Sequence, residues 1–421
     1  MLSRPFIVLY AAVLVATMGI SMVSPLLPVY AEELGATGIW IGLTFASFAV
    51  TQTIFGPFAG RWSDRHGRKP FIVAGLLFYL VAALGYLTAE SFVQVIAFRM
   101  VSGVGTSFIF SVARAYIGDM VPAGHEGRWF GVFATGDIIG FGIGPIFAGV
   151  IRQGLGFDAV FVAMALLMAS SAVIVGMLLP RISPEQRQQA LARRERQLTF
   201  RAALRNRLVL AITLTMLVTS LSFGSTFSFL AVKLEDLRTG PLLIGLTFSM
   251  ESFASAALQP FTGRLADRVN RRVLVVVGIA FTALMLALVG AAHHVVPVMA
   301  LLVGMGIGQS FSFVASSAMQ VVAGRRVGMG TVIGLGSAGN GAGILAGALL
   351  AGLIVDLYSL DAAFYFGGAA MVVGLPLFWW LTAGEQITEE VGPLPPRRAG
   401  ASPPVDARAA EAQGSGLAGE G

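Results

Sequence analysis

The sequence predicts an all-α polytopic membrane protein with 12 transmembrane helices, arranged as two pseudo-symmetric six-helix bundles. The first observation is composition: the chain has 421 residues, is 56% hydrophobic and only 12% charged, and has a mean hydropathy of +0.80. Soluble domains are far less apolar. The second is an internal repeat, because the pentapeptide at 41–45 returns letter for letter at 244–248, an offset of 203 residues. Parallel repeats in an apolar chain are typical of membrane transporters.

Apolar stretches of bilayer length follow one another along both halves of the chain. In the first half they are 6–30, 39–60, 70–89, 91–117, 129–151 and 159–180. In the second half they are 208–232, 241–263, 273–292, 295–324, 327–355 and 362–383. Each is long enough for a helix of about 20 residues that crosses a bilayer. The first stretch is too long for a signal peptide and carries Pro25 and Pro28 near its end, so we expect a retained helix.

Polar segments divide the chain into four parts. We predict one bundle over 1–180, a basic cytoplasmic linker over 181–207, the second bundle over 208–383 and a disordered cytoplasmic tail over 384–421. The linker begins with Ser183 and Pro184, which suit a helix N-terminus on the membrane surface. The tail is rich in Pro, Gly, Ala and Glu and has few apolar anchors.

The basic residues predict the orientation. Most of the 28 Lys and Arg residues fall on the side that holds the N-terminus, whereas Arg152, Lys233 and Arg238 fall on the opposite side. Positive loops stay in the cytoplasm, so both termini are expected there, in a cell inner (plasma) membrane. The net charge of +6 thus reflects topology, and no nucleic-acid partner is expected. The chain has no cysteine, which excludes disulfides and thiolate metal sites, and we expect no metal site and no cofactor.

A charged loop follows the second apolar stretch, with the sequence GRWSDRHGRK at 60–69. It resembles the signature loop of the major facilitator superfamily, and the residues that match are Gly60, Asp64, Arg65, Gly67 and Arg68. The resemblance implies a conformational latch: Asp64 would lie at the positive N-terminus of the eleventh span when the cytoplasmic side is closed. The alternative, a plain basic turn, is less well supported because the spacing occurs twice.

The second copy of the loop lies at 263–272 and is less regular. Asp267 and Arg268 match Asp64 and Arg65, but Asn270 stands in the place of Gly67. By the same reasoning Asp267 would face the start of the fifth span. The substitution suggests that the second latch is the weaker one.

The fifth span contains a motif that indicates a class of function. Its sequence GDIIGFGIGPIFAG at 136–149 resembles the motif of drug:proton antiporters, through Gly140, Gly144, Pro145 and Gly149, with Ala148 in place of a glycine. The second half has no Gly-Pro pair at the equivalent position. A glycine stripe by itself would be a packing face, on which a neighbouring helix approaches closely.

Three ionisable residues lie inside spans and have no equivalent in the other half. Asp137 corresponds to Asn340, Glu251 to Phe48, and Arg99 to Leu302. Charged groups at membrane depth are costly, so such residues mark proton or substrate paths. We predict that Asp137 carries the coupled proton, with Arg99 close to it and Glu251 as a second proton carrier or a site for a cationic substrate. A fixed structural hydrogen bond or ion pair is the alternative for each of them.

Polar and aromatic residues cluster in the seventh and tenth spans. These spans are expected to line a substrate cavity together with Glu251, through Phe223, Phe227, Gln309, Phe311 and Phe313. Serines and threonines also cluster there. Each of them could instead bond the carbonyl of its own preceding helical turn, in which case it needs no cavity.

The sequence therefore predicts a proton-coupled secondary transporter that exports small lipophilic or cationic compounds by alternating access. A carrier of one metabolite, such as a sugar or an amino acid, is the alternative. A non-transporting sensor on the same scaffold would be expected to lose the charged loop or the ionisable residues in the spans, and this chain keeps both. No enzyme activity is expected, because no loop is long enough for an extramembrane active site. The expected partners are a small-molecule substrate and the lipid bilayer, with the protein a monomer.

Overall fold

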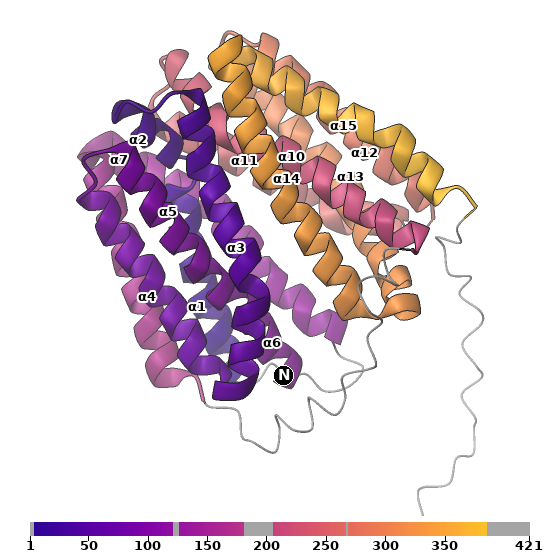
Figure 1. Ribbon diagram of the computed structural model, residues 1–421, viewed down its shortest axis with the longest axis horizontal. Helices are drawn as coiled ribbons and strands as arrows, with labels where there is room; N and C mark the ends of the chain where they lie inside the picture. The colour runs from indigo at the N-terminus through magenta and orange to yellow at the C-terminus, as the bar shows by residue number, and fades with distance from the viewer. Residues whose placement is uncertain (1–3, 121–125, 181–204, 267, 385–421) are drawn as a thin grey trace, which may run out of the picture. The chain divides into compact units, whose positions relative to one another are not determined.

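The computed structural model describes residues 4–120, 126–180, 205–266 and 268–384 (Figure 1). All regular secondary structure in these ranges is helical. Most of the predicted linker, the predicted tail after Gly384, and Asp267 lie outside the described residues. The predicted domain boundaries therefore stay predictions.

The first half of the chain forms its helices close to the predicted stretches. The elements are α1 (Arg4–Val23), α2 (Leu27–Glu33), α3 (Gly38–His66), α4 (Arg68–Leu87), α5 (Phe92–Thr106), η1 (Ser107–Ser111), α6 (Val112–Met120) and α7 (Glu126–Leu178). A break at 24–26, next to Pro25, separates α1 from α2. Proline removes a backbone donor and clashes with the preceding turn, which explains the break.

The described residues contain 11 helices that are long and apolar enough to cross a membrane, one fewer than the stretches in the sequence. The difference comes from α7, which has 53 residues and includes the fifth and sixth predicted spans. Gly156 lies between those spans with φ 81° and ψ −173°, a non-helical conformation at a kink. Glycine adopts such a conformation without a steric penalty, so α7 consists of two helical segments of bilayer length that meet at this kink.

The second half repeats this pattern. Its elements are α10 (Arg207–Asp236), α11 (Pro241–Ala266), α12 (Arg271–Ala291), α13 (Val295–Val327), α14 (Met329–Leu357) and α15 (Leu360–Thr382). Asn206 caps α10, since its side chain accepts hydrogen bonds from the backbone N–H groups of Leu208 and Val209. That cap satisfies two backbone donors that would otherwise have no partner in the helix.

Each half has an apolar core of its own. One cluster, which includes Phe6, Tyr79 and Phe161, belongs to the first half, and another, which includes Ile212 and Phe378, belongs to the second. Two further clusters contain residues of both halves. In one of them, Phe45 of α3 packs with Ile344 and Ala348 of α14.

The halves meet along two helix pairs, α3 with α14 and α11 with α7 (Figure 1). Glycine makes both contacts close. A Cβ on Gly42 would clash with the backbone carbonyl of Ala348, and a Cβ on Gly245 would clash with that of Pro145. These two contacts are related by the repeat offset of 203 residues. The two seams between the halves are therefore built in the same way.

Candidate functional site

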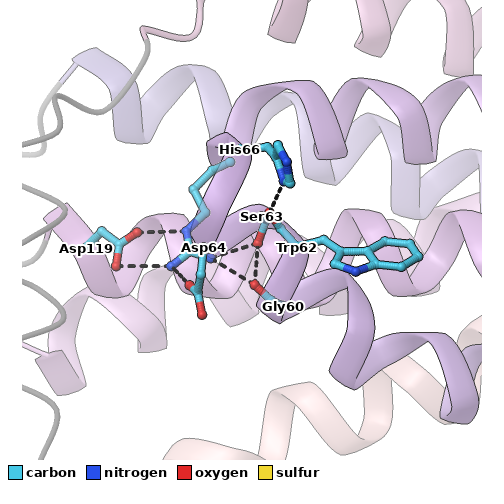
Figure 2. Close-up of polar contacts among 7 residues, drawn as sticks. Gly60, Trp62, Ser63, Asp64, His66 and Asp119 are labelled. Carbon is cyan, nitrogen blue, oxygen red and sulfur yellow. Dashed lines mark hydrogen bonds and ion pairs between the residues drawn. The ribbon is translucent and has the colours of Figure 1, made fainter.

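A polar network lies where α3 ends and α4 begins, and Figure 2 labels Gly60, Ser63, Asp64 and Asp119 of it. Its centre is Arg68, the first residue of α4. Its Nη2 lies 2.5 Å from Asp64 Oδ1, and its Nε donates to Asp119 Oδ2 at 2.8 Å. Its Nη1 donates to Ser63 Oγ at 2.7 Å and to the Gly60 carbonyl at 3.4 Å. The side chain is only 5% exposed. One buried guanidinium thus joins the end of α3 to α6 through two carboxylates.

This network places four of the predicted latch residues. Asp64 pairs with Arg68, Gly60 offers its carbonyl to the same guanidinium, and Gly67 makes the turn between α3 and α4 with φ 96°. Arg65 is exposed. The side chain of Met329 at the start of α14 lies outside the described part of the molecule, so the contact of Asp64 with this helix end stays a prediction.

The second copy of the loop has a different backbone. Asn270 takes φ −59° and caps α12 by accepting a hydrogen bond from the N–H of Arg272 at 3.0 Å. The left-handed turn at Gly67 is therefore absent at Asn270. Arg271, the equivalent of Arg68, donates through Nε to the Ala266 carbonyl at 3.4 Å. Asp267 is not described, so its predicted role is untested.

Asp137 has a neutral partner on the neighbouring helix. Thr17 of α1 donates to its Oδ1 at 3.3 Å. At the equivalent place in the second half, Asn340 of α14 donates to Ser220 Oγ of α10 at 2.7 Å. The offset of 203 residues relates both members of the two pairs. The halves thus keep one interhelical contact, in which the hydroxyl donates to an acid in the first half and accepts from an amide in the second.

Glu251 also has a neutral partner. It is 6% exposed on α11, and Gln309 of α13 donates to its Oε1 at 2.6 Å. Neither Glu251 nor Asp137 forms an ion pair with any residue in the described ranges. Glu251 is buried and has no charged partner among the described residues, so proton uptake can neutralise it without breaking an ion pair.

Arg99 does not lie against either acid in this conformation. Its guanidinium lies 4.4 Å from the ring centroid of Phe48 and 5.1 Å from that of Phe45, and its Nη2 donates to Ser24 Oγ at 3.3 Å. The side chain is 2% exposed, and its Nε has no hydrogen-bond partner among the described groups. Aromatic faces can hold a desolvated guanidinium in this way.

The fourth span contains a feature that the sequence did not predict. The turn η1 is a π-helix that follows the Arg99–Gly105 region and separates α5 from α6. Gly103 and Gly105 pack close to Thr51 of α3 and Gly75 of α4. Single π-turns inside helices are frequent at functional sites.

The glycines of the fifth span contact two neighbouring helices, α1 and α11. Gly140 and Gly144 face α1, where Ser21 donates to the Gly140 carbonyl at 2.8 Å. Gly149 and the carbonyl of Pro145 face the start of α11 in the other half. This motif is therefore at once a packing face within the first half and part of a seam between the halves.

The predicted substrate aromatics occupy three different surroundings. Phe223 and Phe227 stack with centroids 4.0 Å apart, and Phe227 lies 6.1 Å from Phe45 across the seam. Phe311 packs against the core of the second half. Phe313 is 54% exposed. Of the four predicted aromatics, the structure thus brings Phe223 and Phe227 together at the contact between the halves.

The hydroxyls of α10 are used in helix packing. Ser222 and Ser225 donate to the carbonyls of Gly367 and Ala363 on α15 at 2.6 and 2.8 Å. Thr226 and Ser228 bond carbonyls one turn back in their own helix. All four are buried. In this conformation they do not line a cavity, and for Thr226 and Ser228 the alternative interpretation from the sequence holds.

Further ion pairs lie at the predicted outer end. Lys233 of α10 is buried and pairs with Asp361 at the start of α15. Arg152 of α7 pairs with Glu33 and Glu235, and Asp356 of α14 accepts hydrogen bonds from the backbone of α3. The sequence placed both cations outside but assigned them no role. The sequence did contain a signal for these two cations. Each lies at the end of a span, and the equivalent position in the other half carries no charge.

A cavity of about 680 Å³ lies elsewhere, lined by Arg4, Pro5, Lys69 and the residues at 177–180. It contains none of the predicted substrate residues. Its lining comes from the ends of α1, α4 and α7, next to segments that are not described. It therefore contributes nothing to the predicted substrate site.

Comparison with known proteins identifies the class. The family model of the Major Facilitator Superfamily matches residues 9–233 and 212–414. The chain belongs to this superfamily of transporters. It is thus a multi-pass membrane protein of the kind that the repeat and the apolar helices predicted.

Relatives refine the resemblance. The chain is 25% identical over 376 residues to an uncharacterized MFS-type transporter of Methanocaldococcus jannaschii, with 89% of this chain and 97% of the relative covered. It is 28% identical over 385 residues to Multidrug resistance protein 2 of Bacillus subtilis, with 88% and 94% covered. A bacterial homolog of the human lysosomal transporter Spinster, solved in an inward-facing and unoccupied conformation, has the same fold, with a TM-score of 0.67 at 14% identity over 90% of this chain and 95% of that one. The chain therefore resembles the drug:proton antiporters of the superfamily.

Proposed function

We propose that this protein exports small lipophilic or cationic compounds in exchange for protons, by alternating access of two six-helix bundles with 12 spans in all. The observation that carries the proposal is the pair of acids inside the helices. Asp137 and Glu251 each have a neutral hydrogen-bond partner and no ion pair with a described residue. Such a group can bind and release a proton without breaking a salt bridge.

The energy source follows from this chemistry. A proton that moves down the membrane potential releases about 2.3 kcal/mol per 100 mV, so coupled export requires no nucleotide. The proton is the coupling ion, and no other cofactor is invoked. We place the protein in the cell inner membrane as a monomer, with both termini in the cytoplasm.

The compounds fit the aromatic and acidic character of the second half. Phe223 and Phe227 offer stacked rings near the seam, and Glu251 offers a buried carboxylate on α11. Aromatic faces and one acid suit flat, apolar or cationic molecules. The relative named as a multidrug resistance protein supports the same class of compounds.

The test uses everted membrane vesicles with an acid interior. Lipophilic cations and neutral drugs are added, and the collapse of the pH gradient is followed for the wild type, Asp137→Asn and Asp236→Asn. Asp236 is exposed at the end of α10, so Asp236→Asn is a matched control with the same chemical change. We expect several unrelated compounds to collapse the gradient in the wild type and the control, and none in Asp137→Asn.

A response to one metabolite alone would contradict drug export and favour the narrow carrier. An active Asp137→Asn protein would move the proton site to Glu251. The same panel applied to Glu251→Gln separates its two roles. Loss of response to all compounds would indicate proton carriage, and loss of response to cations alone would indicate substrate binding.

A further inference from the structure

The two seams between the halves end in equivalent glycine contacts. At the α3–α14 seam, a Cβ on Gly352 would lie 2.5 Å from the Gly38 carbonyl oxygen. At the α7–α11 seam, a Cβ on Gly149 would lie 2.5 Å from the Pro241 carbonyl oxygen. The repeat offset relates Gly149 to Gly352 and Gly38 to Pro241. The backbones approach equally closely, so a difference in polar contacts there reflects the side chains.

At the first seam, a carboxylate of one half caps a helix of the other. Asp356 Oδ1 accepts from the Gly38 N–H at 2.8 Å, and Oδ2 accepts from the Ile39 N–H at 2.8 Å. These N–H groups belong to the first turn of α3, whose own N-cap residue Thr37 makes no side-chain cap bond. The first N–H groups of a helix lack partners within it and carry partial positive charge. The cap of α3 is thus supplied by α14.

The second seam cannot form this cap. Pro241 occupies the place of Gly38 and has no N–H, and Gln153 occupies the place of Asp356. Arg152 acts there instead: its Nη1 lies 2.5 Å from Glu235 Oε1 in the second half, and its Nη2 lies 3.4 Å from Glu33 Oε1 in the first. The approach to Glu235 is an ion pair without the alignment of a hydrogen bond. The guanidinium also lies 4.1 Å from the ring centroid of Phe157.

We propose that Asp356 and Arg152 form the outer latch of the transport cycle: a helix cap at one seam and an ion pair at the other hold the outer ends of the halves together. The latch rests on the proposed alternating access. Asp356 with Gly38 and Ile39, and Arg152 with Glu235, are polar side-chain contacts that join the two halves. Asp356 is exposed, so water can replace the backbone donors when α14 withdraws from α3. Opening therefore breaks no buried charge pair at that seam.

The test measures the distance between the outer ends directly. The natural chain has no cysteine, so spin labels attach only where cysteine is introduced. Trp40 on α3 and Leu353 on α14 are exposed by 41% and 46% and accept labels in a double variant. Pulsed electron paramagnetic resonance in lipid nanodiscs then reports the populations of the outer-closed and outer-open states.

We expect Asp356→Ala to raise the ratio of outer-open to outer-closed molecules by about fivefold or more, because loss of a helix cap commonly weakens a helix end by that factor. Gln153→Ala is the matched control and should leave the distances unchanged, since Pro241 has no N–H to cap. At the other seam, read by labels at Leu155 and Leu243, Arg152→Glu should open the seam and Arg152→Glu with Glu235→Arg should close it again.

Unchanged distances in Asp356→Ala and in Arg152→Glu would overturn the latch, even if transport fell. Equal opening in Gln153→Ala and Asp356→Ala would overturn it as well, because general loosening would then explain both. Failure of the proposed function looks different. In that case the distances shift as expected, but no compound in the panel collapses the pH gradient.

Discussion

At the scale of single residues, Arg68 shows how one side chain can organise a loop. It satisfies Asp64 and Asp119 together with Ser63 and the Gly60 carbonyl, at 5% exposure. Arg114 is closer to Asp119 in sequence, yet it is exposed and the acid pairs with Arg68. The sequence showed the charges of this loop, but the choice of partner depended on how α4 packs beside α6.

Removing the guanidinium should leave two partly buried carboxylates without their shared cation. We expect Arg68→Leu to lower the free energy of unfolding by about 3 kcal/mol, since breaking a buried ion pair by removing one partner leaves uncompensated charge. Unfolding by SDS in mixed micelles measures this change in the free energy of unfolding. Arg61→Leu is the control in the same loop, because Arg61 is exposed and forms no ion pair with a described side chain. An equal loss in both variants would show that the network contributes nothing specific.

At the scale of secondary structure, glycine decides how closely the helices of the two halves approach. Gly42 and Gly245 face backbone carbonyls of the partner helix at distances that leave no room for a Cβ. Small residues at such crossings are the general device by which helices approach in membranes. The sequence showed these two glycines as part of the repeated pentapeptide at 41–45 and 244–248. Which helix each glycine faces depended on the fold.

A larger side chain at this crossing should separate α3 from α14. We expect Gly42→Leu to reduce transport more than tenfold at normal protein levels, because the halves could no longer meet at the seam. Gly176→Leu is the comparison on α7, where a Cβ would meet nothing within 4 Å, and it should transport like the wild type. Uptake into everted vesicles measures both variants. Wild-type transport by Gly42→Leu would show that close approach at the seam is not required.

At the scale of the whole molecule, the repeat makes the differences between the halves informative. Thr17 with Asp137 and Ser220 with Asn340 occupy equivalent places, and each pair is joined by a hydrogen bond. The second pair shows that the amide form is compatible with the fold at this position. Asp137→Asn should therefore change proton chemistry without disrupting the packing of α1 against α7.

Moving the acid to the other half tests whether its position matters. We expect the exchange variant, Asp137→Asn with Asn340→Asp, to be as stable as the wild type to within about 1 kcal/mol, as isosteric changes at hydrogen-bonded sites usually are. It should still fail to couple substrate to protons, because the Gly-Pro motif next to Asp137 has no equivalent beside Asn340. The vesicle assay measures the coupling. Restored gradient collapse would show that either half can carry the proton.

The sequence by itself determined the helical class, the repeat and the identity of the ionisable residues in the spans. These follow from local rules, because a bilayer requires apolar stretches of fixed length and penalises every charge within them. The duplicated sequence then identified Asp137, Glu251 and Arg99 as residues without equivalents in the other half. Confirmed among these predictions are the superfamily and the apolar helices.

Only the tertiary structure decided the partners. It placed the kink between the fifth and sixth spans at Gly156, placed Arg99 against Phe45 and Phe48, and supplied the cap of α3 from Asp356. Asp356 and Gly38 are separated by 318 positions in the chain, so no local pattern records their contact. Such contacts depend on how closely two helix backbones approach, and that distance is set by packing across the entire seam.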